Sequence, residues 1–92
     1  MNKVITHGLI MRELGALKTC PYQSLQELIG KPMSKNVIGP DGKEYQLSVE
    51  AVWDGDPGGD LRVIVSVDDK GWKALFPINS SFIMSPTGEV VG

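Results

Sequence analysis

Glu44–Ile78 reads EYQLSVEAVWDGDPGGDLRVIVSVDDKGWKALFPI, and this stretch decides the fold. Apolar and polar side chains alternate along Tyr45–Trp53 and again along Leu61–Asp68. Successive side chains of a strand point to opposite faces, so each segment predicts a strand with one buried face. Asp54–Asp60 lies between them and is a loop by its Gly, Pro and Asp content. The stretch therefore predicts an antiparallel meander.

A third strand is predicted at 72–78, after the turn sequence Asp68-Asp-Lys-Gly71. That sequence suits a type I turn followed by a left-handed Gly, the three-residue hairpin loop with a bulge. The turn sets four apolar pairs on the buried face: Val67 with Trp72, Val65 with Ala74, Val63 with Phe76, and Leu61 with Ile78. Turn chemistry and hydrophobic pattern thus give the same register.

The opposite face of the meander carries a mixed set of side chains. Pairing Trp53 with Leu61 sets Val52 beside Arg62, and the third strand would set Ile64 opposite Leu75. The candidate interaction surface comprises Val52, Arg62, Ile64, Lys73, Leu75 and Pro77. The alternatives are that a helix or the C-terminal segment covers this face, or that the apolar residues are simply scattered on it.

A long helix is predicted over residues 2–19, before the meander. One apolar side follows helical spacing and a second lies elsewhere on the helix; the two sides are Ile10, Leu14 and Leu17, and Ile5, Leu9 and Ala16. A helix with two apolar sides is either buried on both or pairs with another chain. Pro21 ends the segment, because the residue before a proline avoids the helical region.

A second, short helix is predicted over residues 24–29. Ser24 suits the N-cap, with Glu27 three residues later completing a capping box. Gly30 suits the C-cap, and Pro32 would stop the helix just beyond it. Leu25, Leu28 and Ile29 would then face the core.

Helices grouped before strands predict an α+β fold, with two N-terminal helices packed on an antiparallel meander of three to five strands. The main strands are expected at 44–53, 61–68 and 72–78, and two short additions at 37–39 and 82–84. Ser85–Gly88 is expected to form a turn, and residues 89–92 a tail. A length of 92 residues fits one domain covering 1–92.

Composition limits the classes of function. Hydrophobic residues make up 41% and charged residues 22%, as in ordinary globular proteins. The formal charge of −2 argues against a nucleic-acid partner, which would require a basic surface. No apolar run approaches the roughly 20 residues of a membrane span, and no secretory signal is present, so we expect a cytoplasmic protein without membrane contact. The single Cys20 cannot form an intramolecular disulfide.

Nucleophilic chemistry has weak candidates. His7 and Cys20 are the only residues of their types, and about 20 Å of helix would separate them. A Cys–His site requires hydrogen-bonding distance between the two, so structural or exposed roles are preferred.

Acidic and aromatic residues form further candidate sites. Asp54, Asp56 and Asp60 suggest a cation loop, but the positions that an EF-hand requires hold Gly58 and Val65. The sequence therefore favours turn-forming aspartates there. Asp41 could share one end of the sheet with Asp68 and Asp69, where solvated turn charge is preferred to acid–base chemistry. Trp53 and Trp72 fall on the inward face and are expected in the core. We expect no cofactor and no metal.

One stretch resembles a known group of proteins. Residues 57–72, PGGDLRVIVSVDDKGW, together with Phe76-Pro77 and Ser81-Phe82-Ile83, resemble a family of small bacterial domains of unknown function. The resemblance covers about the last half of the chain. It implies a bacterial single-domain protein and transfers no activity or site residue.

The function expected from the sequence is a non-enzymatic protein-interaction domain, either an accessory protein that forms homo-oligomers or an immunity-type protein that masks a toxin. The acidic charge would speed association with a basic partner. The alternative is a small-ligand-binding or enzymatic domain with a pocket between helix and sheet.

Overall fold

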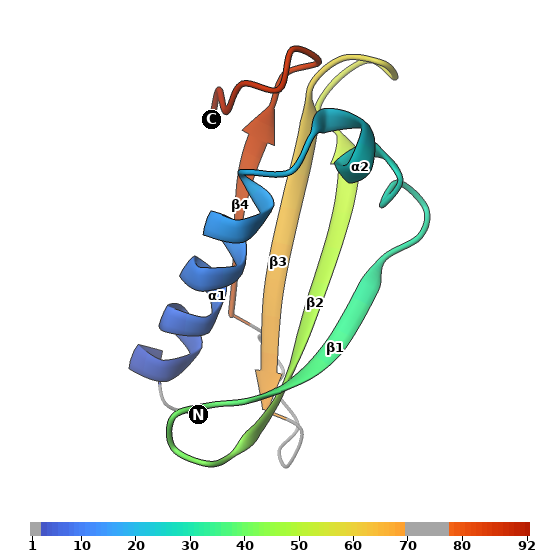
Figure 1. Ribbon diagram of the computed structural model, residues 1–92. Coiled ribbons are helices and arrows are strands. Elements are labelled where there is room, and N and C mark those ends of the chain that lie inside the picture. The colour runs from blue at the N-terminus through green and yellow to red at the C-terminus, as the bar shows by residue number, and fades with distance from the viewer. Residues whose placement is uncertain (1–2, 70–77) are drawn as a thin grey trace.

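Four strands form one antiparallel sheet in the order β1-β2-β3-β4, and one helix lies across it (Figure 1). The computed structural model describes residues 3–69 and 78–92. Its elements are α1 (Lys3–Leu17), α2 (Tyr22–Gln26), β1 (Met33–Ile38), β2 (Glu44–Trp53), β3 (Leu61–Asp69) and β4 (Ile78–Met84). The α+β class predicted from the sequence is confirmed.

The β2–β3 hairpin is the predicted one. Trp53 pairs with Leu61 and Val52 with Arg62, as the loop length required. The buried side chains of the two strands follow the expected alternation: Tyr45, Leu47, Val49, Ala51, Leu61, Val63, Val65 and Val67. This face of the sheet, which α1 covers in part, is called the inner face below, and the opposite one the outer face.

The register predicted for the next hairpin is wrong. Val63 pairs with Phe82 and not with Phe76, and Val67 pairs with Ile78 and not with Trp72. The predicted strand at 72–78 lies, apart from Ile78, outside the described residues. The cause is burial, because the observed register places Phe82 and Met84 at 2% and 0% exposure. A locally favourable turn sequence was outweighed by the apolar surface that the later segment removes from water.

The prediction of two packed N-terminal helices is also wrong, because only α1 is long. α2 has five residues and begins after Pro21, which has φ −64° and ψ 151°. Ser24 lies inside this turn, where its N–H donates to the Pro21 carbonyl at 3.1 Å, so it is no N-cap. Proline fixes the backbone angle in advance and sets the start of the helix two residues earlier than the capping signal.

The helix α1 covers only half of the inner face. Its buried side chains are Thr6, Ile10, Leu14 and Leu17. They confirm the first predicted apolar side, and they pack against β3 and β4. Of the second side, Ile5 and Leu9 are half-buried and Ala16 is exposed. The strand β1 is at one edge of the sheet, on the side away from α1 (Figure 1).

Residues 89–92 do not form a free tail. Ser85–Gly88 makes the predicted turn, with Gly88 at φ 89° and its N–H donating to the Ser85 carbonyl. The chain then runs back along β4, where Met84 pairs with Val90. Among the described residues, no helix is long and apolar enough to cross a membrane.

Candidate interaction surface

The outer edge of β1 exposes backbone hydrogen-bonding groups. The Gly39 N–H donates to the Lys43 carbonyl at 2.8 Å, which fixes the alternation of hydrogen bonds between β1 and β2. In an antiparallel ladder every second residue bonds to the neighbouring strand. Val37, paired with Tyr45, therefore bonds inward, whereas the N–H and C=O groups of Ser34, Asn36 and Ile38 point away from the sheet. No hydrogen bond joins these outward groups to another part of the chain that the structure describes.

At the opposite edge of the sheet, the last outward-facing residue of β4 has hydrogen-bond partners. The outward N–H of Ile83 donates to the Gly92 carbonyl at 2.9 Å, and the Ile83 carbonyl accepts from the Val91 N–H at 2.8 Å. Residues 91 and 92 thus bond to the outward N–H and C=O of Ile83 on β4. The corresponding backbone groups of β1 remain exposed. The covering reaches only Ile83, since the outward groups of Asn79 and Ser81 bond to no other described part of the chain, whereas β1 is open over all three of its outward residues.

Few of the usual devices that protect an edge strand are present in β1. Native edges are blocked by prolines, bulges or charged side chains. The register of β1 is unbroken over all six residues, none of which is proline. Its one charged side chain is Lys35, whose Nζ lies 3.1 Å from Glu13 Oε1 on α1. The ammonium group is therefore directed over the inner face toward the helix.

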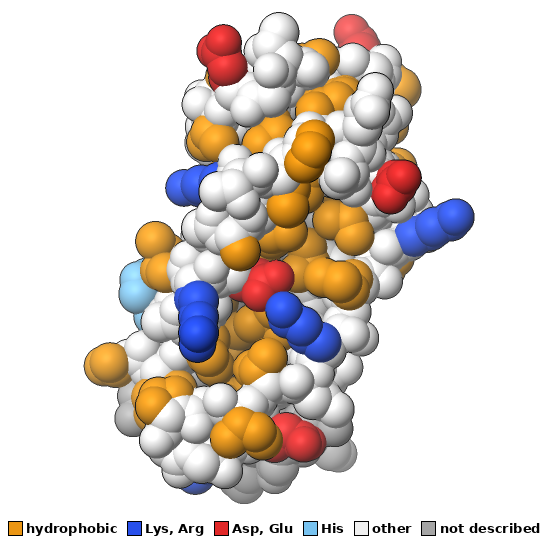
Figure 2. Space-filling view, viewed as in Figure 1, with side chains coloured by type: hydrophobic (Ala, Val, Ile, Leu, Met, Phe, Trp, Pro, Cys, Tyr) orange, Lys and Arg blue, Asp and Glu red, His pale blue; other side chains and the backbone are white. Residues whose placement is uncertain are grey.

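Apolar side chains line the space between α1 and β1, in a region here called the inner strip. It consists of Ile5, Leu9, Met33 and Val37, of which Met33 is 40% exposed and the others half-buried. Figure 2 shows hydrophobic side chains running between the two elements, with charged groups near the middle. The strip lies directly beside the open edge.

The sequence-predicted surface lies on the outer face. Val52 is 42% exposed and Ile64 half-buried, and Arg62 between them forms an ion pair with Asp54 at 3.1 Å. Ile64 lies opposite Ser81 and not opposite Leu75. Lys73, Leu75 and Pro77 lie outside the described residues. The three described members do lie together, with the apolar Ile83 opposite Arg62, and the nearby residues of the same face are polar at Ser48, Glu50, Ser66 and Ser81.

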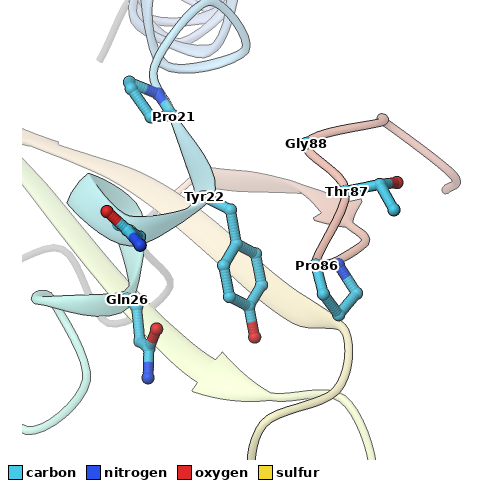
Figure 3. Close-up of a pocket in the computed structure, with 7 residues that line it drawn as sticks. Pro21, Tyr22, Gln26, Pro86, Thr87 and Gly88 are labelled. Atoms are coloured by element: carbon cyan, nitrogen blue, oxygen red, sulfur yellow. The ribbon is translucent and has the colours of Figure 1, made fainter.

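A cleft of about 490 Å³ lies between α2 and the turn that follows β4. Figure 3 shows the Tyr22 ring between the two walls of the cleft. The lining is Pro21, Tyr22, Gln23, Gln26, Pro86, Thr87 and Gly88, without a charged side chain. The Tyr22 hydroxyl donates to the Gly59 carbonyl at 2.7 Å and so ties α2 to the β2–β3 loop. Sequence reasoning missed this cleft, because its residues are far apart in the chain.

The turn at Asp41 is locked by its own side chain. Asp41 Oδ2 accepts a hydrogen bond from the Tyr45 hydroxyl at 2.7 Å, and Oδ1 accepts one from the Lys43 N–H at 3.2 Å. The Tyr45 hydroxyl, aided by the Lys43 N–H, lowers the pKa of this carboxyl. Asp68 lies in β3 opposite Gln46. The carboxylate of Asp41 therefore has a structural role in the hairpin.

The remaining candidates have structural surroundings. His7 is exposed on α1, and the Cys20 thiol donates to the Ala16 carbonyl at 3.6 Å. In the loop, Asp54 binds Arg62, and the Asp56 carbonyl accepts from the Gly59 N–H. Over residues 3–69 and 78–92, no group of three or more His, Cys, Asp or Glu side chains could hold a metal ion.

Comparisons with protein-family models, curated proteins and solved structures give no match for this chain.

Proposed function

We propose that this chain is a non-enzymatic protein-interaction domain that accepts an extended segment of a partner as an additional strand beside β1. The observation that carries the proposal is the open edge of β1, where Ser34, Asn36 and Ile38 direct their backbone groups outward. The sequence-based expectations of a cytoplasmic location and of no nucleic-acid or membrane partner belong to the same proposal.

Strand addition supplies both affinity and specificity. Each of the three residues offers one N–H and one C=O, and six strand residues extend about 20 Å. Main-chain hydrogen bonds give affinity in this mode of recognition, and alternate side chains of the added strand give specificity.

Alternate side chains of the added strand would contact different surroundings on the two faces of the sheet. Toward the inner face, an apolar residue of the partner would cover Val37 and Met33 in the inner strip. Toward the outer face it would meet Ile38, which is 65% exposed, and the polar Asn36. We therefore expect a partner segment with alternating apolar and polar residues.

A proline substitution tests the proposal directly. Asn36→Pro removes the outward N–H, and proline is tolerated on an edge strand when its nitrogen faces solvent. Asn36→Ala is the matched control, because it changes the side chain and keeps the N–H. In affinity capture from the native lysate, the wild type and Asn36→Ala should retain the same partner, and Asn36→Pro should lose it while its circular dichroism spectrum is unchanged. Equal capture by all three chains would refute strand addition at β1.

The uncharged cleft beside Tyr22 favours a second candidate function, the binding of a small neutral ligand. Two glutamine amides, a threonine hydroxyl and an aromatic ring line it, which suits a polar molecule without charge. A thermal-shift screen with neutral sugars and short peptides tests this function. A ligand at about 100 times its dissociation constant adds about 2.7 kcal/mol of stability. The shift should disappear in Gln26→Ala, and a flat response across the panel would remove this candidate.

A further inference from the structure

We infer that the segment added to β1 is the β1 strand of a second copy of this chain, paired antiparallel about a two-fold axis at Asn36. The inference rests on the proposed function, since it names the occupant of the same edge. It follows from the register that the outward-facing residues allow, from the charges beside them, and from the state of the opposite edge.

The alternation of hydrogen bonds restricts the possible registers. In a two-fold pairing the bonded residues must come from Ser34, Asn36 and Ile38, because only these direct backbone groups outward. An axis at Asn36 sets this residue opposite its own copy, and Ser34 opposite Ile38 of the second copy. All three outward residues then bond, so this register uses every exposed group of the strand.

Charge and strand length distinguish this register from its neighbours. Moving the axis to Lys35 would set two lysines opposite each other in a non-hydrogen-bonded pair, where side chains are closest and like charges destabilise. Moving it to Val37 would set Ser34 opposite Pro40, which lies beyond the end of β1 and has no N–H. With the axis at Asn36, Lys35 instead faces Val37, and Lys31 of one copy comes beside the turn of the second copy that carries Asp41. Lys31 and Asp41 are both exposed, and symmetry gives this arrangement twice.

The pairing closes on itself. An isologous two-fold contact uses the same patch on both copies and leaves no further β1 edge. The outward groups of Ile83 on β4 are already bonded to residues 91 and 92. The product is a dimer with one continuous eight-stranded sheet, in which the inner strips of the two copies lie next to each other on one face.

Site-specific cross-linking tests both the occupant and the register. In a Cys20→Ser background, Asn36→Cys would place two thiols on residues whose Cα atoms lie about 5.5 Å apart, within the range of a disulfide. Lys35→Cys and Val37→Cys are matched controls on the same strand. Their Cα atoms would lie more than about 7 Å from their own copies, so we expect oxidation to be at least about tenfold slower.

Light scattering supplies the second readout, on reduced protein. The wild type should reach twice the mass of one chain as its concentration rises, and Asn36→Pro should stay at the single mass. Lys31→Glu should weaken the dimer severalfold, because it sets a carboxylate beside the turn that carries Asp41, and added salt should relieve the effect. Arg12→Glu makes the same change of charge on the exposed side of α1 and should leave the dimer unaffected.

The failures of the inference and of the proposed function are distinguishable. Preferred cross-linking at 35 or 37 would overturn the register. A wild type with the single mass at every concentration, together with capture that Asn36→Pro abolishes, would overturn the second copy as occupant and leave strand addition standing. A single mass with capture insensitive to Asn36→Pro would overturn both.

Discussion

Gly39 is packed so closely that one added methyl group has no room. A Cβ at this position would lie 2.7 Å from Tyr45 Cε2 and 2.8 Å from Asp41 Oδ1. We expect Gly39→Ala to lower the free energy of unfolding by about 1–3 kcal/mol, because overpacking forces the neighbouring side chains to move. Urea unfolding followed by circular dichroism measures the change.

Gly15 is the matched control for this prediction. It lies exposed in α1, and a Cβ there would meet no atom within 4 Å. Gly15→Ala should raise the free energy of unfolding by about 1 kcal/mol, the difference in helix propensity between the two residues. If Gly39→Ala proved as stable as the wild type, the hairpin would have to relax around the methyl group.

The carboxylate of Asp41 makes stability depend on pH in acid. Its hydrogen bonds from Tyr45 and Lys43 lower its pKa in the folded chain below the usual value of 3.8. A group with a lowered pKa stabilises the fold above the unfolded pKa, and the contribution is lost as pH falls through the folded pKa. The difference in melting temperature between the wild type and Asp41→Asn should therefore be full at neutral pH and shrink below 3.8. A difference that stayed constant over that range would contradict a role for the ionised form.

Two buried side chains determine the register of strand β4 on β3. Phe82 and Met84 are almost fully buried beneath α1, opposite Val63 and Leu61. We expect Phe82→Ala to lower the free energy of unfolding by about 3–5 kcal/mol, as for other buried aromatic residues. Asn79→Ala, on an exposed position of the same strand, should change it by less than about 0.5 kcal/mol. Similar losses in the two variants would show that Phe82 does not occupy the core.

Elements were predicted well where one local pattern determined them. The alternation in β2 and β3 and the loop between them fixed a register that the structure reproduces at Trp53 and Leu61. Prediction failed where two local signals competed, as at the hairpin that follows Val67. The turn sequence favoured pairing with Trp72, but only the non-local burial of Phe82 decides the pairing, and a local pattern carries no information about it.

The open edge could not be predicted from the sequence for the same reason. The sequence suggested a short strand near Val37 and Ile38, but the order of strands is a property of the sheet. Neither the exposure of Asn36 nor the covering of Ile83 by residues 91 and 92 leaves a trace in composition or spacing. The predicted surface at Val52 and Ile64 remains a prediction, and the β1 edge is a different part of the molecule.

The sheet is open along β1, and its other edge is covered at Ile83 by residues 91 and 92, so the two edges offer different contacts to a second copy. A two-fold contact along β1 closes on itself, whereas pairing of β1 with an uncovered β4 edge would allow one copy to add to the next without limit. The Val91 N–H holds the covering segment on β4, since it donates to the Ile83 carbonyl at 2.8 Å. The number of associating copies should therefore depend on a backbone group that is remote from β1.

Removing that one donor should change closed association into open association. Val91→Pro lacks the N–H, so the Ile83 carbonyl becomes available, and we expect species larger than two copies in sedimentation velocity at concentrations where the wild type is a dimer. Val91→Ala keeps the N–H and should behave as the wild type does. Combining Val91→Pro with Asn36→Pro should abolish the larger species, because growth then lacks its β1 partner. Larger species that persist in the double variant would mean that β1 takes no part in growth, and the association would then have to come from another surface, such as Val52 and Ile64 on the outer face.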